Sequence, residues 1–292
     1  MRRRDVLGAA GSVVLGAGTA RAQQSQAQQS LAQQNRPLRI AVTNDMSGPY
    51  AANAGTGSRT AIQLAIRDMN GRAGGRPVEL VALDHQNKPD LASSLVTRAF
   101  DVDGVEAVFD IANSSLSLSI QEIARPRGKV VIHVGSSHDG LYGKQCSPTS
   151  ALWLYDTYSL ARGLTRTLVE AGGDTWFCIA VDYTFGVVMQ QEAERTLAQL
   201  GGRMLGTVRH PLGATDFSSY LLSARASRAK VIMLANASAD TINAIKQAHE
   251  FRMLGQGREA RHPDLLRQQH QGARAGIGAG AAIPRRLLLG PR

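Results

Sequence analysis

The sequence predicts an α/β fold of two lobes, each built on a parallel β-sheet that is flanked by helices. From residue 38 onward, short apolar runs alternate with amphipathic helical segments, and this order starts again after about residue 150. Strands that alternate with helices favour parallel sheets with right-handed crossovers. The 292 residues are enough to build two such units.

The first lobe is predicted over residues 37–150. Its first helix is expected to bury one apolar face and to stop at glycines, and the helix after its third strand is expected to open with a serine cap. The predicted apolar face consists of Ala61, Leu64, Ala65 and Met69. The strands are expected at 38–45, 77–87, 105–113 and 129–137, and the later helices at 91–104 and 114–128.

The second lobe is predicted over residues 151–256. A strand and loop are expected at 174–186, a strand and turn at 202–213, a strand at 229–238, and helices at 150–171, 187–201, 216–227 and 239–253. The carboxyl ends of parallel strands would face a cleft between the two lobes, where small ligands bind in such folds.

The N-terminus predicts export. Residues 1–22 combine an Arg-rich start, a short Gly/Ala-rich apolar stretch and a small-residue cleavage site at Ala20-Arg21-Ala22, as in a signal peptide. The run RRDVL favours the twin-arginine route over an ordinary Sec signal. The Gln-rich residues 23–36 predict a flexible leader. We therefore expect a periplasmic protein.

The formal charge of +10 does not indicate nucleic-acid binding. The excess of Arg lies in residues 1–23, at Arg36 and in residues 257–292, so the region between is nearly neutral, whereas nucleic-acid binding requires a basic surface. The segment 257–292 holds seven Arg and no aromatic residue, without strand or helix periodicity. It is interpreted as an aberrant tail from a frameshift, with a native disordered basic tail as the alternative.

Neither metal nor cofactor chemistry is indicated. Cys146 and Cys178 are the only cysteines, and two cysteines this far apart make no metal site. Export would permit a disulfide, but Cys178 lies in the apolar run WFCIAV and is expected to be a buried residue. The histidines show no metal-binding spacing, and the glycines at residues 55 and 57 lack the spacing of a dinucleotide-binding loop.

Two short hydroxyl-rich loops follow successive strands. Ser136 and Ser137 come after the fourth predicted strand, and Ser114 and Ser115 come after the third. Hydroxyls and backbone N–H groups at strand ends and helix starts can bind a carboxylate, although a plain capped turn would explain either loop alone. The neighbouring His138 and Asp139 suggest a catalytic triad, but triads are built from residues distant in sequence.

The opposite wall of the cleft is expected to be aromatic. The loop Asp182-Tyr183-Thr184-Phe185-Gly186 closes the first strand of the second lobe and offers two rings and a carboxylate. The turn Ser47-Gly48-Pro49-Tyr50 is expected to place a ring at the rim of the cleft.

The succession of these motifs resembles the periplasmic substrate-binding proteins of ABC transporters, of the branched-chain amino-acid (leucine/isoleucine/valine) type. The resemblance covers residues 37–256 and is carried by LRIAVTNDMSGPYAANAGTGSRTAIQLAIRDMNG, VEAVFDIANSSLSLSIQEIA, AVDYTFG and DFSSYLLSARASRAKVIMLANAS. It implies two Rossmann-like lobes of the type I periplasmic binding protein fold, which close on a small-molecule ligand and perform no chemistry. It also implies a monomer that passes its ligand to an ABC permease in the inner membrane.

The resemblance implies that the two hydroxyl loops hold the carboxylate and amine of the ligand. The ligand-binding residues expected from it are Ser114, Ser115, Gly135, Ser136, Ser137, Tyr50, Tyr183, Phe185 and Asn236. Asn236 follows a strand that often ends in an aromatic or acidic residue in the family, so the ligand stays open between an amino acid and an aromatic or other organic acid.

Two alternatives to solute capture for an importer remain. One is a sensory or regulatory binding protein of the same fold, and the other is an exported serine hydrolase that uses Ser136 or Ser137. The family continues beyond the position where the odd tail begins, so the resemblance also implies a truncated chain with an incomplete second lobe.

Overall fold

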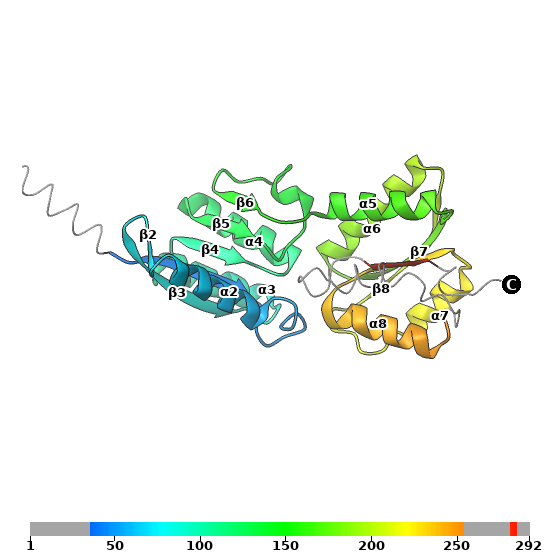
Figure 1. Ribbon diagram of the computed structural model, residues 1–292, viewed down its shortest axis with the longest axis horizontal. Helices are drawn as coiled ribbons and strands as arrows, with labels where there is room; N and C mark the ends of the chain where they lie inside the picture. Colours follow the sequence, from blue (N-terminus) through cyan, green and yellow to red (C-terminus); the bar gives the residue numbers. More distant parts are fainter. Residues whose placement is uncertain (1–35, 254–280, 285–292) are drawn as a thin grey trace, which may run out of the picture.

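The computed structural model describes residues 36–253 and 281–284, which form two α/β lobes. The predicted signal peptide, almost all of the Gln-rich leader and most of the predicted tail lie outside the described residues. Figure 1 shows the lobes side by side, connected by the segment that leads from β6 to α5. The prediction of two lobes of parallel sheet is confirmed.

The first lobe is a six-stranded sheet in the order β2-β3-β1-β4-β5-β6. All pairs in it are parallel except β2 with β3. Its strands are β1 (Leu38–Asn44), β2 (Arg72–Ala73), β3 (Arg76–Asp84), β4 (Ala107–Asp110), β5 (Val130–His133) and β6 (Ser150–Leu152). Its helices are α2 (Gly55–Asp68), α3 (Pro89–Asp101) and α4 (Ser114–Ala124), with 3-10 turns at Arg125–Arg127 and Asp139–Leu141.

The second lobe is a four-stranded sheet in the order β10-β9-β7-β8. Its strands are β7 (Thr175–Val181), β8 (Arg203–His210), β9 (Val231–Ala235) and β10 (Ala281–Pro284), and its helices are α5 (Thr157–Glu170), α6 (Thr184–Gln199), α7 (Ser218–Ala226) and α8 (Ser238–Glu250). β7 pairs in parallel with β8 and β9, whereas β10 pairs antiparallel with β9. The sequence pattern showed no strand in residues 257–292, and for Ala281–Pro284 that interpretation is wrong.

The apolar run of β7 is continuous because both faces of its sheet are covered. Trp176 and Cys178 pack with α5 and α6, and Phe177 and Ile179 pack with α7 and α8. A strand buried on both faces shows no polar alternation, which is the pattern seen in WFCIAV. Cys178 is fully buried and both cysteines are free thiols, so the buried role expected for Cys178 is confirmed.

The apolar face predicted for α2 is wrong. Ala61, Leu64, Ala65 and Met69 are exposed, and Leu64 is 44% and Met69 50% accessible. The partly buried stripe instead comprises Ser58, Ile62 and Ile66, at positions i, i+4 and i+8. On this side of the helix, Ser58 lies near the buried carboxylate of Asp110 and lowers its pKa.

Two predicted boundaries also shift. The helix expected at 150–171 begins only at Thr157, after the short strand β6 and a linker, and Asp156 caps it by accepting a hydrogen bond from the Ser159 backbone N–H at 2.6 Å. The helix expected at 187–201 begins at Thr184, so Phe185 belongs to its first turn.

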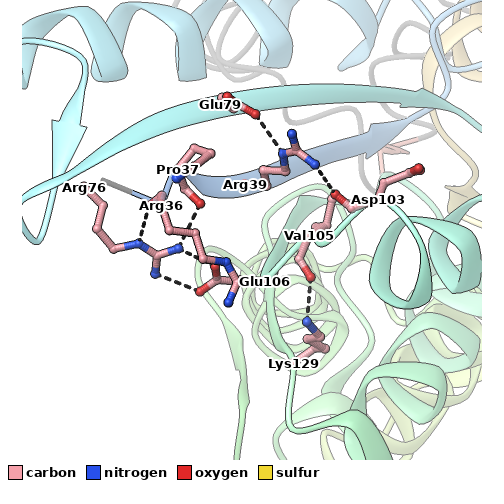
Figure 2. A network of polar contacts seen from close by, with 9 residues as sticks. All are labelled: Arg36, Pro37, Arg39, Arg76, Glu79, Asp103, Val105, Glu106 and Lys129. Atoms are coloured by element: carbon pink, nitrogen blue, oxygen red, sulfur yellow. Dashed lines mark hydrogen bonds and ion pairs between the residues drawn. The ribbon is translucent and has the colours of Figure 1, made fainter. Parts of the chain in front are cut away.

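An ion-pair network fastens the amino ends of the strands in the first lobe (Figure 2). The Arg76 guanidinium donates to both oxygens of Glu106, at 2.5 and 3.0 Å, and to the backbone carbonyls of Arg36 and Pro37. These bonds tie the chain ahead of β1 to β3 and to the residue before β4. A bidentate pair of this kind also holds the pKa of Glu106 below its usual value.

Each sheet has a switch point where successive crossovers leave in opposite directions. In the first lobe it lies between β1 and β4, and in the second between β7 and β9. Side chains that follow these strands therefore border a crevice at the carboxyl edge of each sheet. Among residues 36–253 and 281–284, none of the helices has the length and apolar character to cross a bilayer.

Gly186 is required where β7 turns into α6, which yields a stability prediction. A Cβ at this position would lie 2.1 Å from the Val181 carbonyl oxygen, a backbone atom that cannot move aside cheaply. We expect Gly186→Ala to destabilise the second lobe by about 1–3 kcal/mol and to lower the melting temperature in a thermal unfolding scan.

The matched control is Gly163→Ala in α5. A Cβ there meets no atom within 4 Å, so the variant should be stabilised by about 0.5–1 kcal/mol through its higher helix propensity. Equal melting temperatures for the two variants would contradict the close-approach argument.

Candidate functional site

A small pocket lies where the two lobes meet. It has a volume of about 20 Å³, the room that about one water molecule needs. Its lining consists of Tyr50, Asn53, Ala112, Ser114, Gly135, Ser137, Tyr155, Tyr183, Phe185 and Ala237. These residues follow β1, β4, β5, β6, β7 and β9, so both switch points contribute to one cavity.

Six of the nine ligand-binding residues expected from the sequence line this pocket. They are Tyr50, Ser114, Gly135, Ser137, Tyr183 and Phe185. The other three have different surroundings. Ser115 donates across the lobe boundary to the Thr184 hydroxyl at 2.8 Å, and Asn236 is buried in a hydrogen-bonded group with His210 and Thr241. Ser136 is 1% exposed and lies outside the lining.

Ser114 reaches the pocket because it is the first residue of α4. The cap of this helix is Asn113, not a serine as predicted, since the Asn113 side chain accepts from the backbone N–H groups of Ser115 and Leu116 at 2.9 and 3.2 Å. The Ser114 hydroxyl is therefore left free of a capping role. Ser114 adds a helix N-terminus, with its positive dipole end, to the pocket wall.

Gly135 brings the end of β5 against the end of β4. A Cβ on Gly135 would lie 2.7 Å from the Asp110 Oδ1 atom and 2.9 Å from the Ala112 Cα atom, so only glycine fits. Two residues later, the Ser137 carbonyl accepts from the Thr157 N–H at 2.6 Å, which joins this loop to the start of α5. The Ser137 hydroxyl is thus held between the two lobes.

The buried carboxylate of Asp110 connects four elements behind the pocket. It accepts a hydrogen bond from the Asn44 amide at 2.5 Å, and the Ser58 hydroxyl and the Gly135 backbone N–H also lie near enough to lower its pKa. Burial raises the pKa of Asp110, while these three groups oppose the rise. Asp110 and Ile111 adopt φ values of 79° and 78°, a strained backbone that the surrounding bonds maintain.

Asp45 shapes the loop that carries Tyr50. Its carboxylate accepts from the backbone N–H groups of Gly48 and Tyr50, at 2.5 and 2.7 Å, and from the Asn87 amide at 2.7 Å. Tyr50 is consequently 2% exposed and lies inside the site instead of at its rim.

A phenol pair bridges the lobes. The Tyr50 and Tyr183 hydroxyl oxygens are 2.8 Å apart, and the Tyr183 ring centroid lies 6.2 Å from that of Phe185. Burial raises the pKa of both phenols, so both remain protonated over the physiological range. Asp182, expected to face the ligand, is exposed and lies 3.8 Å from Arg209, so the phenols provide the polar groups of this wall.

Tyr155 is the main pocket residue that the sequence analysis missed. It lies in the linker between β6 and α5, a stretch that was assigned to a helix. The available signal was the pair of aromatic residues Trp153 and Tyr155 immediately before Asp156, a favoured cap residue at which a helix would begin. The motifs also did not predict three other lining residues, Asn53, Ala112 and Ala237, because the recognisable motifs lie at neighbouring positions.

The described residues hold no cluster of His, Cys, Asp and Glu suited to a metal ion. His85 and His133 are fully buried near the strand ends, and burial lowers the pKa of each to about 4. His133 Nε2 lies 3.2 Å from the Gln121 amide oxygen, which makes it a neutral structural residue.

Comparison with known proteins identifies similar chains. Residues 37–256 match the family described as "Periplasmic binding protein". The crystal structure of a periplasmic binding protein from Burkholderia mallei is 42% identical, with a TM-score of 0.71, and the match covers 74% of this chain and 57% of that one. A branched chain amino acid ABC transporter periplasmic ligand-binding protein from Burkholderia xenovorans LB400 is 38% identical, with a TM-score of 0.63, over 75% of this chain and 59% of that one.

A curated relative is more distant. The Leu/Ile/Val-binding protein homolog 6 of Brucella abortus (strain 2308) is 20% identical over 182 residues, which are 62% of this chain and 46% of that protein. The chain spans about half the length of the curated relatives it matches.

The two buried histidines predict a loss of stability in mild acid. Their folded-state pKa values lie below the ordinary value of 6.5, so the unfolded chain binds more protons as the pH falls from 6.5 to 4. Their stabilising contribution is complete above pH 6.5 and is lost progressively below it, on the order of 3 kcal/mol for each. Urea unfolding at pH 7 and pH 4.5 measures the difference.

A His133→Gln variant removes one of the two titrating groups and puts a neutral amide in place of the imidazole. We expect a smaller decrease between the two pH values for this variant than for the parent chain. An unchanged decrease would show that His133 does not titrate as its burial implies.

Proposed function

The chain belongs to the family of periplasmic binding proteins, and from this premise we propose that it is the solute-binding component of an ABC importer. In this function it captures a small carboxylate-bearing ligand between its lobes and passes it to a permease in the inner membrane. We further propose that it acts as a monomer in the periplasm and is exported by the twin-arginine route, for which residues 1–22 provide the signal.

One observation carries the proposal: a single pocket receives side chains from the switch points of both sheets. The wall from the first lobe supplies the Ser114 and Ser137 hydroxyls and the N-terminus of α4, groups that suit an anion. The wall from the second lobe supplies Tyr183 and Phe185, which would cover the ligand. Contributions from two lobes are what a protein needs to bury a ligand by closing on it.

Opening of the lobes gives a ligand access to the site, and closure gives the site its affinity. A cavity of about 20 Å³ does not admit an amino acid or a benzoate, so a ligand enters only when the lobes separate and the phenols of Tyr50 and Tyr183 part. The ligand then replaces direct contacts between the lobes, including the 2.8 Å bond from Ser115 to Thr184. Ligand-driven closure requires that the ligand interact more favourably with the closed state than with the open state. The exchanged contacts provide this difference.

The surroundings of Ser136 are those expected of a protein that binds a ligand without catalysis. A nucleophilic serine needs a base within hydrogen-bond reach, and the Ser136 Oγ atom has no hydrogen-bond partner among the residues that the structure describes. We therefore propose that Ser136 is not a nucleophile, and that Ser114 and Ser137, the two serines of the lining, donate hydrogen bonds to the ligand.

The test is ligand-dependent thermal stabilisation of the full chain. A panel of small carboxylates, both amino acids and acids without an amino group, is expected to contain compounds that raise the melting temperature, because a ligand bound only by the folded state stabilises it. Ser114→Ala should weaken binding of the best compound about 10–100-fold, as expected for a lost hydrogen bond to a carboxylate.

Ser119→Ala is the matched control, because Ser119 is an exposed serine on the same helix. It should bind like the parent chain. The absence of stabilisation by every compound in the panel, or equal losses in both variants, would refute the proposed function.

A further inference from the structure

The lining of the pocket has polar groups but no formal charge. Among the described residues that form it, the polar side chains are amide or hydroxyl groups, and none is acidic or basic. A ligand carboxylate can be held there by hydroxyl donors and the start of α4. A ligand ammonium would find no carboxylate in contact, and a charge desolvated without a partner is strongly disfavoured.

The carboxylates nearest to the pocket are already engaged in holding its walls. Asp45 accepts hydrogen bonds from the loop that carries Tyr50, and Asp110 accepts from Asn44 at the end of β1. Diverting either to a ligand would undo the turn that forms the site.

Asp240 is the third buried aspartate of the described residues, beside Asp45 and Asp110, and it lies outside the lining. It is 1% exposed, its Oδ2 atom accepts from the Gly213 N–H at 3.2 Å, and its Oδ1 atom has no hydrogen-bond partner among the described residues. It stands close enough to Tyr50 and Tyr183 for its charge to raise the pKa of both phenols, but it is not one of the residues that line the cavity.

Aromatic rings form much of the rest of the wall. Tyr50, Tyr155, Tyr183 and Phe185 all line the pocket, and successive centroids are 6.4 Å apart from Tyr50 to Tyr183 and 6.2 Å apart from Tyr183 to Phe185. These separations and the tilted ring planes are typical of favourable aromatic packing. A flat ring inserted between the lobes would meet ring faces and edges on several sides.

We infer that the ligand of this pocket is an aromatic carboxylate that carries no amino group. The inference rests on the proposed function and narrows its ligand class. The carboxylate faces the hydroxyls of Ser114 and Ser137, and the ring of the ligand contacts the four aromatic side chains.

Three matched pairs of compounds test the inference by calorimetric titration of the full chain. The pair 3-phenylpropanoate and phenylalanine, and the pair 4-methylpentanoate and leucine, differ only in the ammonium group. Benzoate and cyclohexanecarboxylate differ in the aromaticity of the ring. We expect at least ten-fold tighter binding of each acid without the amino group, and at least three-fold tighter binding of benzoate than of cyclohexanecarboxylate.

The outcomes separate the two proposals. Equal or tighter binding of phenylalanine or leucine than of its partner would overturn the ligand class and leave the solute-binding function standing. Equal binding of benzoate and cyclohexanecarboxylate would overturn the aromatic part of the inference. Binding of none of the six compounds would overturn the inference together with the proposed function.

A substitution at Ala237 tests directly whether the absence of an acidic group in the pocket lining selects the ligand. Ala237 lines the pocket and is the N-cap residue of α8, with an extended backbone (φ −147°, ψ 169°) and no side-chain cap. Asp and Asn are both favoured at an N-cap, so both variants should fold. Ala237→Asp should weaken benzoate binding at least ten-fold and reduce or reverse the preference for 3-phenylpropanoate over phenylalanine.

Ala237→Asn has nearly the same shape without the charge and should keep the parent's order of preference. If Ala237→Asp leaves the preference unchanged, or if Ala237→Asn alters it equally, charge in the lining does not select the ligand and the inference fails. Melting temperatures of the two variants verify that both are folded.

Discussion

The buried carboxylate of Asp110 is the interaction on which the site depends. It accepts a hydrogen bond from Asn44 at the end of β1, and Ser58 in α2 and Gly135 after β5 lie beside it, so three elements meet at one side chain at the end of β4. The positive φ values of Asp110 and Ile111 turn the chain away from the sheet toward Ser114. Such a conformation costs free energy, and these contacts offset it. The orientation of the first-lobe wall therefore follows from a group that does not touch the pocket.

The second-lobe wall is set by close packing instead of charge. Gly186 allows the first turn of α6 to approach the Val181 carbonyl, and this places Phe185 and Tyr183 at the end of β7. The two walls then meet through hydroxyl pairs, Tyr50 with Tyr183 and Ser115 with Thr184. Neutral hydroxyl pairs cost little to separate because water replaces them when the lobes open. A small apolar cluster of Tyr50, Ala112 and Ala237 also spans the boundary, while each lobe keeps its own larger apolar core.

The sequence anticipated much of the first-lobe wall and less of the second. Ser114 and Ser137 were predicted because short polar residues at the ends of parallel strands must share one edge of a sheet, and Gly135 was expected from the family resemblance. The face of α2 was predicted wrongly, because the helix carries two apolar stripes and only its packing in the folded lobe decides which of them is partly buried. Tyr155 was missed because its position depends on the linker between lobes, for which no local periodicity exists.

By itself the sequence determined the order of strands and helices, their parallel arrangement and the hydroxyl-rich loops after β4 and β5, because strand and helix periods and turn residues are local properties of the chain. Only the tertiary structure decided which hydroxyls reach the pocket, with Ser137 in the lining and the adjacent Ser136 outside it. It also decided that Tyr50 meets Tyr183, a residue 133 positions away, across the lobe boundary. The physical reason is that the meeting of these side chains depends on the rotation of each helix and on the packing of one lobe against the other. No short segment of the sequence determines either.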